Sequence, residues 1–137
     1  QRRQKMTAVI DVSGAAQILF QTSKKDRFET VLQNASRVLS PDLYRAELSN
    51  TLWKYYIKGI YTQEECVKII EDGLNYVDEY ISSKNIWREA FGESVKNKHS
   101  VYDMLYAVIA RENNAVLMTN DKALVKICEK LNVEHCF

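Results

Sequence analysis

Two apolar runs that each end in an aspartate constrain the fold of this 137-residue chain more than any other feature. Residues 8–10 lead directly into Asp11, and a second run, residues 115–120, leads into Asp121. A short uninterrupted apolar run is typical of a strand buried on both faces, as in a parallel sheet covered by helices. Ligands of such sheets bind beyond the carboxyl ends of the strands. The two aspartates therefore predict an acidic, cation-binding pocket at that edge of the sheet.

The length of the chain is suited to one domain. With 137 residues it can bury a genuine core, but it is too short for two domains of ordinary size. Residues 1–5 are polar and basic and precede Met6, so we interpret them as a leader or as residues added for expression. We therefore expect the folded domain to occupy residues 6–137.

The charge balance and the cysteines exclude several classes of protein. The net charge is only +1, so no global field marks the chain as a binder of nucleic acid or membranes, and any polyanion must be held locally. Three cysteines, Cys66, Cys128 and Cys136, are an odd and poorly spaced set for a disulfide framework. We find no signal peptide or long apolar span. We therefore expect a cytoplasmic protein that does not bind a membrane.

Strand and helix signals alternate along the chain, without repeats or low-complexity segments. This alternation predicts an α/β fold, with a mainly parallel central sheet covered by helices on both sides. The strands are expected at residues 8–10, 37–39, 76–81, 115–120 and 133–137, and the helices at residues 13–22, 28–35, 41–58, 63–74, 86–95, 101–112 and 124–131.

Local signals predict where several of these helices begin and end. Ser40 and Pro41 suit the N-cap and the first residue of a helix, and Gly59 suits the left-handed residue that ends it. Thr62 has capping-box spacing to an acidic residue three positions later. Residues 113–114 are both asparagine, which tolerates the left-handed turn before the last apolar strand.

Four acidic residues stand in otherwise apolar surroundings, and each also has a purely structural explanation. Asp11 and Asp121 are placed to cap the helices that follow them. Asp103 is placed as the third residue of a capping box opened by Ser100. Glu47 is harder to explain in this way, because its helix face is shared with apolar and neutral polar residues rather than with lysines.

Taken together, the four acids predict a cation site. Two follow strands and two lie on helices that can pack beside the strand ends, and carboxylates about 4 Å apart repel by roughly 4 kcal/mol per pair without a counter-charge. Oxygen ligands select a hard ion, Mg²⁺ or Mn²⁺. We assign His99 and His135 to surface or packing roles because each stands alone, and most tyrosines, Tyr106 included, to the core or a subunit contact.

Four segments together resemble the PIN domain family, and within it the VapC-type ribonuclease toxins of toxin–antitoxin pairs. The resemblance covers the chain from Met6 onward. VIDVS is similar to the family's first strand, SPDLYRAELSNTL to the segment with its second acid, YDMLYAVIA to the helix with its third and LMTNDKAL to the strand end with its fourth. The resemblance assigns the catalytic, metal-binding acids to Asp11, Glu47, Asp103 and Asp121, with Ser13, Asn50 and Thr119 as supporting residues.

The resemblance implies a metal-dependent endoribonuclease, in which the acids hold one or two Mg²⁺ or Mn²⁺ ions that activate a water. It also implies an RNA substrate, a homodimer and a cognate antitoxin. Two departures concern the end of the chain: residues 113–114 replace a glycine that usually precedes the last core strand, and Asp121 matches the loosest ligand of such sites.

Three other hypotheses compete with the nuclease. The strongest is a PIN-fold interaction module that hydrolyses nothing, against which the presence of all four acids argues. A haloacid-dehalogenase-like phosphatase and a response-regulator receiver both require a second acid beside Asp11, where Val12 and Ser13 stand. These two fit poorly.

Overall fold

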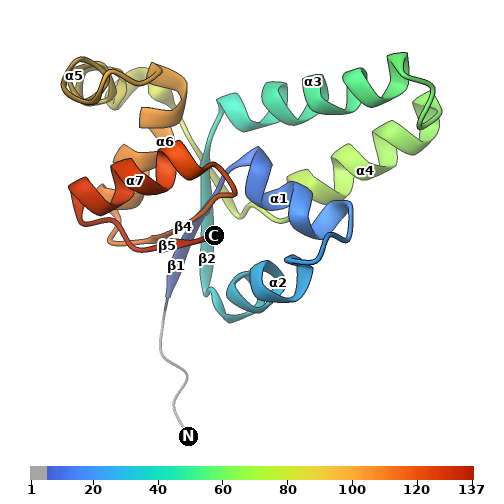
Figure 1. Ribbon diagram of the computed structural model, residues 1–137, viewed down its shortest axis with the longest axis horizontal. Helices are drawn as coiled ribbons and strands as arrows, with labels where there is room; N and C mark the ends of the chain where they lie inside the picture. The colour runs from blue at the N-terminus through green and yellow to red at the C-terminus, as the bar shows by residue number, and fades with distance from the viewer. Residues whose placement is uncertain (1–5) are drawn as a thin grey trace, which may run out of the picture.

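A five-stranded parallel sheet forms the centre of the computed structural model, which describes residues 6–137 (Figure 1). Every neighbouring pair of strands is parallel, in the order β3-β2-β1-β4-β5. The predicted parallel α/β fold is confirmed, while the interpretation of residues 1–5 lies outside the described residues. The strands are β1 (Thr7–Ile10), β2 (Arg37–Pro41), β3 (Glu79–Ile81), β4 (Val116–Met118) and β5 (His135–Cys136).

Helices cover the sheet on both sides. In Figure 1, α5, α6 and α7 lie to one side of the strands and α1 and α2 to the other, while α3 and α4 form a hairpin that extends away from the sheet. None of the described helices is long and apolar enough to cross a lipid bilayer. Their bounds are α1 (Val12–Leu19), α2 (Lys25–Asn34), α3 (Leu43–Ile57), α4 (Gln63–Asn75), α5 (Trp87–Asn97), α6 (Val101–Glu112) and α7 (Lys122–Leu131), with a short 3-10 helix at Ser83–Asn85.

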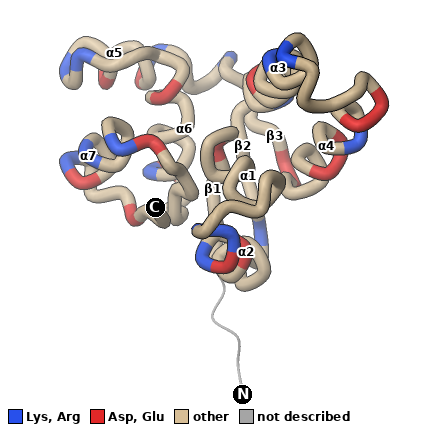
Figure 2. The backbone as a smooth tube through the Cα atoms, turned by 45° about the vertical axis from the view of Figure 1, so that its right-hand side comes forward, with Lys and Arg blue, Asp and Glu red and all other residues tan. Residues whose placement is uncertain are grey.

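The core lies between the sheet and α6. Residues 8–10 of β1 are completely buried, because β1 is the central strand and both of its faces are covered. Residues 104–110 of α6 are buried on every side, and this helix packs on β1, β2 and β4. Charged residues of both signs are interspersed along the outer helices (Figure 2).

The expected start of the helix after β2 is wrong. Ser40 and Pro41 belong to β2, where Pro41 is paired in register with Ile81 of β3, and the helix begins at Leu43. The Ser40 hydroxyl does not cap a helix but donates to the carbonyl oxygen of Ile10 at 2.8 Å. Pairing within the sheet outweighs the local capping signal, because a buried strand satisfies more backbone groups than one cap does.

Other boundary signals are confirmed. Thr62 forms a complete capping box with Glu65 at the start of α4, and Gly59 adopts a left-handed φ of 72° after α3. Asn114 takes the left-handed turn before β4, with a φ of 51°. These signals depend on local backbone geometry alone, which explains why the sequence shows them.

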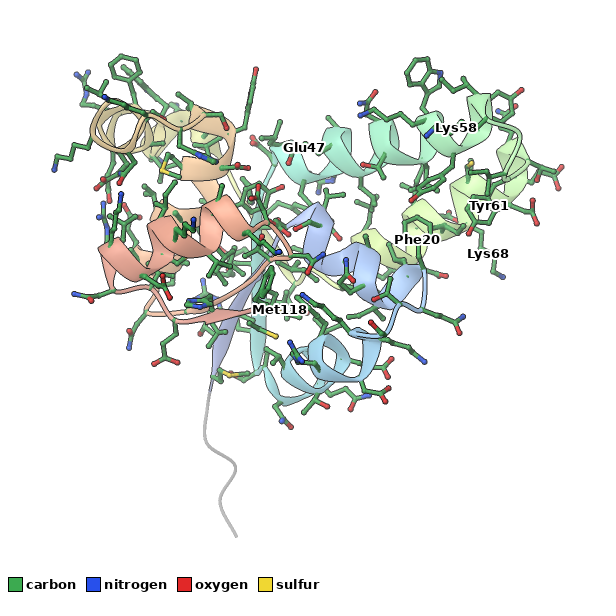
Figure 3. The ribbon with its side chains drawn as sticks, viewed as in Figure 1. Phe20, Glu47, Lys58, Tyr61, Lys68 and Met118 are labelled. Carbon is green, nitrogen blue, oxygen red and sulfur yellow. The ribbon has the colours of Figure 1, made fainter. Side chains whose placement is uncertain are left out.

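An aromatic cluster fixes the α3–α4 hairpin against α1. The ring of Phe20, just after α1, lies 4.8 Å from that of Tyr55 on α3 and 6.2 Å from that of Tyr61 in the loop before α4 (Figure 3). The hydroxyl of Tyr44 on α3 donates to the carbonyl oxygen of Gly73 on α4 at 2.8 Å. The aromatic contacts therefore tie the hairpin to α1 near the end of α3 that is remote from Glu47, and the Tyr44 bond joins α3 to α4 near the end that carries Glu47.

The order of the strands creates a crevice beside β1. The chain passes from β1 to β2 and β3 on one side, and then returns to form β4 on the other side of β1. Ligands of open α/β sheets bind at such a reversal of strand order, outside the carboxyl ends of the strands. The residues that follow β1 and β4 therefore flank the expected site.

Candidate metal centre

A cavity of about 170 Å³ lies beyond the carboxyl ends of β1 and β4. It receives acidic side chains from four separate segments of the chain: the end of β1, the first half of α3, the first turn of α6 and the start of α7. The fold thus brings together all four acids that the sequence singled out. The lining residues are Asp11, Val12, Ser13, Glu47, Asp103, Tyr106 and Asp121.

Asp11 is the most deeply buried acid of this cavity, with 6% of its surface exposed. Its Oδ1 accepts from the Ser13 hydroxyl and from the backbone N–H of Gly14, both at 2.7 Å, and its Oδ2 accepts from the Thr119 hydroxyl at 2.5 Å. Burial raises the pKa of Asp11 to about 6; the three hydrogen bonds lower it, and the charge of Asp103 raises it slightly. Asp11 therefore caps α1, as the structural explanation expected, and also faces the cavity.

The hydroxyls that bind Asp11 also join β4 to α1. The Ser13 hydroxyl accepts from the backbone N–H of Asn120 at 2.8 Å, and the Thr119 hydroxyl accepts from that of Asp121 at 3.1 Å. Gly14 makes this approach possible, because a Cβ atom at this position would lie 2.3 Å from the carbonyl oxygen of Met118. The network holds the ends of β1 and β4 in one rigid arrangement.

Glu47 reaches the cavity from the end of α3 nearest the sheet, whereas Lys58 follows the other end (Figure 3). The hydroxyl of the buried Tyr106 donates to Glu47 Oε1 at 2.6 Å. Burial raises the pKa of Glu47, and the bond from Tyr106 partly opposes this effect. Burial and the neighbouring charge of Glu47 raise the pKa of Tyr106, so its phenol stays protonated and serves as a donor.

The expectation that Tyr106 only packs in the core or at a subunit contact is incomplete. Tyr106 is buried, but its hydroxyl orients an acid of the cavity. A sequence signal was present, because Tyr106 follows Asp103 by three residues and therefore lies on the same face of α6.

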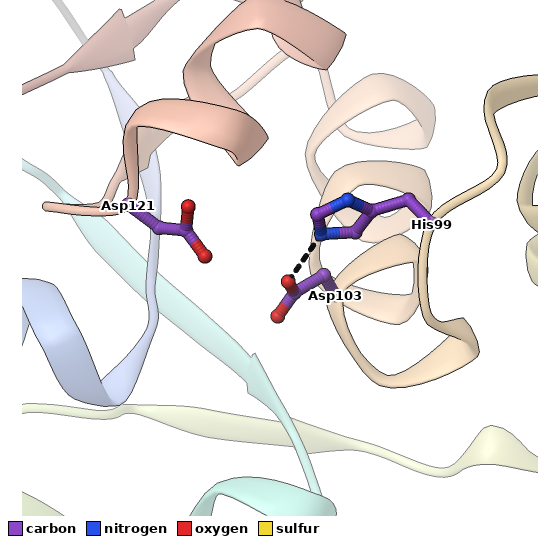
Figure 4. A group of neighbouring side chains, drawn as sticks. All are labelled: His99, Asp103 and Asp121. Atoms are coloured by element: carbon purple, nitrogen blue, oxygen red, sulfur yellow. Dashed lines mark hydrogen bonds and ion pairs between the residues drawn. The ribbon is translucent and has the colours of Figure 1, made fainter.

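His99 lies beside Asp103, at the turn between α5 and α6. Its Nε2 is 2.6 Å from Asp103 Oδ2, and the two side chains are 20% and 28% exposed. Single ligand atoms of His99, Asp103 and Asp121 all lie within 4.8 Å of one another, and the three side chains converge (Figure 4). The expectation that His99 is an isolated surface or packing residue is therefore wrong.

The reason for this placement is local. Lys98 ends α5 in a left-handed conformation with a φ of 52°, which turns the chain so that His99 directly precedes the N-cap of α6 and lies one helical turn before Asp103. The four-residue spacing from His99 to Asp103 was the available sequence signal. Ser100 caps α6 by accepting from the Asp103 N–H at 3.3 Å, but the Asp103 carboxylate binds His99 and does not complete the expected capping box.

The fourth acid combines both of its expected roles in one place. Asp121 Oδ1 accepts from the backbone N–H groups of Ala123 and Leu124 at 2.9 and 3.3 Å and so caps α7, while its side chain also lines the cavity. Asn50 is different, because it is exposed one turn beyond Glu47 and is not among the residues that line the cavity. Its supporting role remains a prediction, as do the ligand roles of the acids.

The donors in the cavity fit a hard divalent cation. Carboxylate oxygens dominate the set, and one imidazole nitrogen stands beside them. Carboxylates prefer Mg²⁺ and Mn²⁺, and a cation would compensate the charge that burial makes unfavourable at Asp11.

Comparison with known proteins gives a consistent result. The sequence matches the family described as PIN domain over residues 8–130. It is 24% identical over 123 residues to ribonuclease VapC3 of Pyrobaculum aerophilum, covering 88% of this chain and 94% of that protein. The fold is similar to the crystal structure of PAE2754 from Pyrobaculum aerophilum, with a TM-score of 0.70, 18% identity and coverage of 94% of this chain and 98% of that one. It is also similar to a chain of the crystal structure of VapBC2 from Rickettsia felis bound to a DNA fragment from the promoter of that pair. The TM-score is 0.67 and the identity 18%, and the match covers 95% of this chain and 97% of that one.

Proposed function

The chain belongs to the PIN domain family, and on this premise we propose that it is a divalent-cation-dependent endoribonuclease. The observation that carries the proposal is the convergence of four carboxylates from distant segments on one cavity at the reversal of strand order. Capping of α1 does not by itself require a charged side chain at this position, because a neutral asparagine also caps a helix, whereas burial opposes the charge of Asp11. A relative that covers nearly the whole chain is named a ribonuclease, which supports RNA as the substrate.

In the proposed reaction, water attacks a phosphodiester bond of RNA. Mg²⁺ or Mn²⁺, when bound, supplies the positive charge that screens the phosphate and activates the water. Asp11, Glu47, Asp103 and Asp121 would hold the cation. Ser13 and Thr119 fix both oxygens of Asp11, and Tyr106 fixes Glu47, so the cavity keeps its shape before the substrate arrives.

Cleavage of a mixed RNA pool tests the activity directly. The wild type with Mg²⁺ or Mn²⁺ should cleave RNA, and Asp11→Asn and Asp103→Asn should each reduce the rate about 100-fold or more, because each removes a charged ligand. Asp26→Asn is a matched control, since Asp26 is exposed on α2. Equal cleavage by wild type and both cavity variants would refute the proposal, and intact RNA in every sample would favour the silent interaction module.

We further propose that the chain is the toxin of a type II toxin–antitoxin pair. The solved VapBC2 assembly motivates a protein partner, and an apolar groove of about 300 Å³ between α3 and α4 offers it a surface. Trp53 and Tyr56, about half exposed, lie along this groove with Leu52, Cys66, Val67 and Ile70. Expression of the wild type should arrest growth, Asp11→Asn should not, and Trp53→Glu should prevent rescue by the co-expressed antitoxin. Rescue that is unaffected by Trp53→Glu would exclude this groove.

The same proposal includes a homodimer that uses α5. Trp87, Phe91 and Val95 recur every four residues on this helix and are 50%, 57% and 63% exposed, so they form one apolar stripe. Phe91→Glu should convert a dimer into a monomer in analytical ultracentrifugation, whereas Trp53→Glu should leave the dimer intact. A wild type that sediments as a monomer would refute the homodimer.

We place this activity in the cytoplasm because the cysteines suit a reducing compartment. Cys66, Cys128 and Cys136 are free and buried. Burial raises the pKa of the Cys128 thiol to about 12, so this thiol is inert as a nucleophile. Thiol labelling of the native protein should therefore be slow and become complete only on unfolding.

A further inference from the structure

We infer that His99 is a nitrogen ligand of the cation site and gives it a preference for Mn²⁺ over Mg²⁺. The inference rests on the proposed cation site and adds a residue that the four-acid pattern does not contain. It concerns the side of the cavity where Asp103, with His99 beside it, faces Asp121 (Figure 4).

The geometry already places three donor atoms around one point. His99 Nε2 is 2.6 Å from Asp103 Oδ2, and an oxygen of Asp121 completes a set whose atoms lie within 4.8 Å of one another. Donors bound to one small dication at about 2.1 Å lie at most about 4.2 Å apart, so side-chain shifts of well under 1 Å bring all three into contact with it. Each of these side chains is partly buried, which limits the number of other conformations.

The three residues come from two separate parts of the fold, because His99 and Asp103 lie together at the turn into α6, whereas Asp121 approaches them from the start of α7. Asp103 lies in the first turn of α6, Asp121 is the N-cap of α7, and His99 follows the left-handed Lys98 at the end of α5. Asp121 is anchored by the two backbone N–H groups that it caps. A ligand cage built from rigid elements binds a cation with little reorganisation.

The chemistry of the donor decides which cation benefits. Carboxylates bind Mg²⁺ and Mn²⁺ alike, whereas an imidazole nitrogen favours transition-metal ions, and Mg²⁺ takes oxygen ligands almost exclusively. A site with His99 therefore gains affinity for Mn²⁺ and gains almost none for Mg²⁺. The carboxylates of Asp103 and Asp121 keep the site hard enough for an ion of this class.

A structural role for His99 predicts a different behaviour. If His99 only donates a hydrogen bond that positions Asp103, the loss of His99 weakens the binding of Mn²⁺ and Mg²⁺ equally. Glutamine then substitutes for the histidine, because the glutamine amide also donates a hydrogen bond. If His99 is a ligand, glutamine removes the nitrogen and the Mn²⁺ preference falls even though a donor to Asp103 remains.

Calorimetric titration of the EDTA-stripped full chain separates the two roles. We expect His99→Gln to weaken Mn²⁺ binding about tenfold or more and Mg²⁺ binding less than threefold, with His135→Gln, on β5, as the matched control that changes neither. Equal weakening of both cations in His99→Ala, together with wild-type affinities in His99→Gln, would overturn the inference. Thermal unfolding of each variant by circular dichroism shows that the domain remains folded.

Pulsed electron paramagnetic resonance of Mn²⁺ bound to the wild type does not depend on any variant. Coupling to an imidazole ¹⁴N is expected, and it should disappear in His99→Gln but persist in His135→Gln. Bound Mn²⁺ without this coupling would overturn the inference while leaving the acidic site intact. Mn²⁺ binding that survives both Asp11→Asn and Asp103→Asn would instead refute the proposed cation site itself, so the two failures are distinguishable.

Discussion

Asp11 is the residue at which folding and charge oppose one another most strongly. Its carboxylate accepts three hydrogen bonds, yet burial still raises its pKa from 3.8 to about 6. A side chain kept in this state contributes less to stability than a neutral replacement of the same shape. Its position is therefore understood through the cation that the cavity is proposed to bind.

The first prediction concerns the stability of the cation-free protein as pH changes. The folded Asp11 carboxyl binds its proton more tightly than the unfolded one, so the contribution of Asp11 to the unfolding free energy is highest below about pH 4 and falls as pH rises through about 6. The loss amounts to about 3 kcal/mol from this group. Urea unfolding in EDTA should show this slope in the wild type and a shallower one in Asp11→Asn. The assignment would be contradicted if the wild type gained stability relative to Asp11→Asn, instead of losing it, as the pH rises from about 4 to about 6.

The second prediction isolates the hydroxyl of Tyr106. Tyr106→Phe keeps the buried ring but removes the donor to Glu47 Oε1, so we expect about tenfold weaker Mn²⁺ binding and a loss of only about 1 kcal/mol in stability. Tyr44→Phe is the matched control, because its hydroxyl binds the Gly73 carbonyl oxygen within the α3–α4 hairpin. Equal Mn²⁺ affinities in both variants would show that Tyr106 is only a packing residue.

The sequence indicated the acids of the cavity but not all of their partners. Asp11 and Asp121 were recognisable because they follow buried strands, and Asp103 because it opens an apolar helix. His99 and Tyr106 were not recognised, since a lone histidine or a tyrosine in an apolar helix normally has a structural role. Their function depends on which side chains the tertiary fold places opposite them.

At the scale of elements, the contact between α1 and β4 sets the geometry of the cavity. The third prediction is that Gly14→Ala costs about 3 kcal/mol of unfolding free energy and weakens Mn²⁺ binding, because the new Cβ would meet the Met118 carbonyl at 2.3 Å. Gly92→Ala on α5 is the control: no atom lies within 4 Å, so the better helix former should stabilise by about 0.5 to 1 kcal/mol. If the two variants unfold at the same urea concentration, the close approach of α1 and β4 does not contribute to stability as we propose.

A charged clamp joins α5 to the last turn of α6. Arg111 binds Glu89 at 2.6 Å and the nearly buried Glu93 at 2.8 Å. The fourth prediction is that Arg111→Met lowers stability by about 2 kcal/mol, because Glu93 is left unpaired, and that adding Glu93→Gln restores part of the loss. Arg37→Met removes only an exposed ion pair and should cost less than about 1 kcal/mol. A double-mutant cycle without coupling between Arg111 and Glu93 would contradict this account.

Elements with a strong hydrophobic pattern were predictable, and boundaries set by tertiary contacts were not. Residues 8–10 and 101–112 carry patterns that only a buried strand and a buried helix explain. Ser40 and Pro41 have the local chemistry of a helix start, but β1 and β3 flank β2 and recruit both residues into the sheet. The position of such a boundary depends on the strands that pair with the segment and cannot be predicted from the segment alone.

At the scale of the whole molecule, the order of the strands turns distant residues into neighbours. Asp11 and Asp121 are 110 positions apart, yet β1 and β4 are adjacent and parallel, so both acids reach the same edge. The alternation of strands and helices predicted the parallel sheet but not the position of the α3–α4 hairpin, which depends on aromatic contacts with α1. Exposed apolar surfaces on that hairpin and on α5 are likewise visible only in the folded chain.

Anomalous X-ray diffraction from crystals of the protein grown with Mn²⁺ tests the central claim most directly. The account predicts a strong anomalous peak within the cavity, in contact with carboxylate oxygens of Asp11 and Asp103, and its absence in crystals of Asp103→Asn. Well-ordered crystals whose anomalous peaks all lie elsewhere, with the cavity filled only by water, would contradict it.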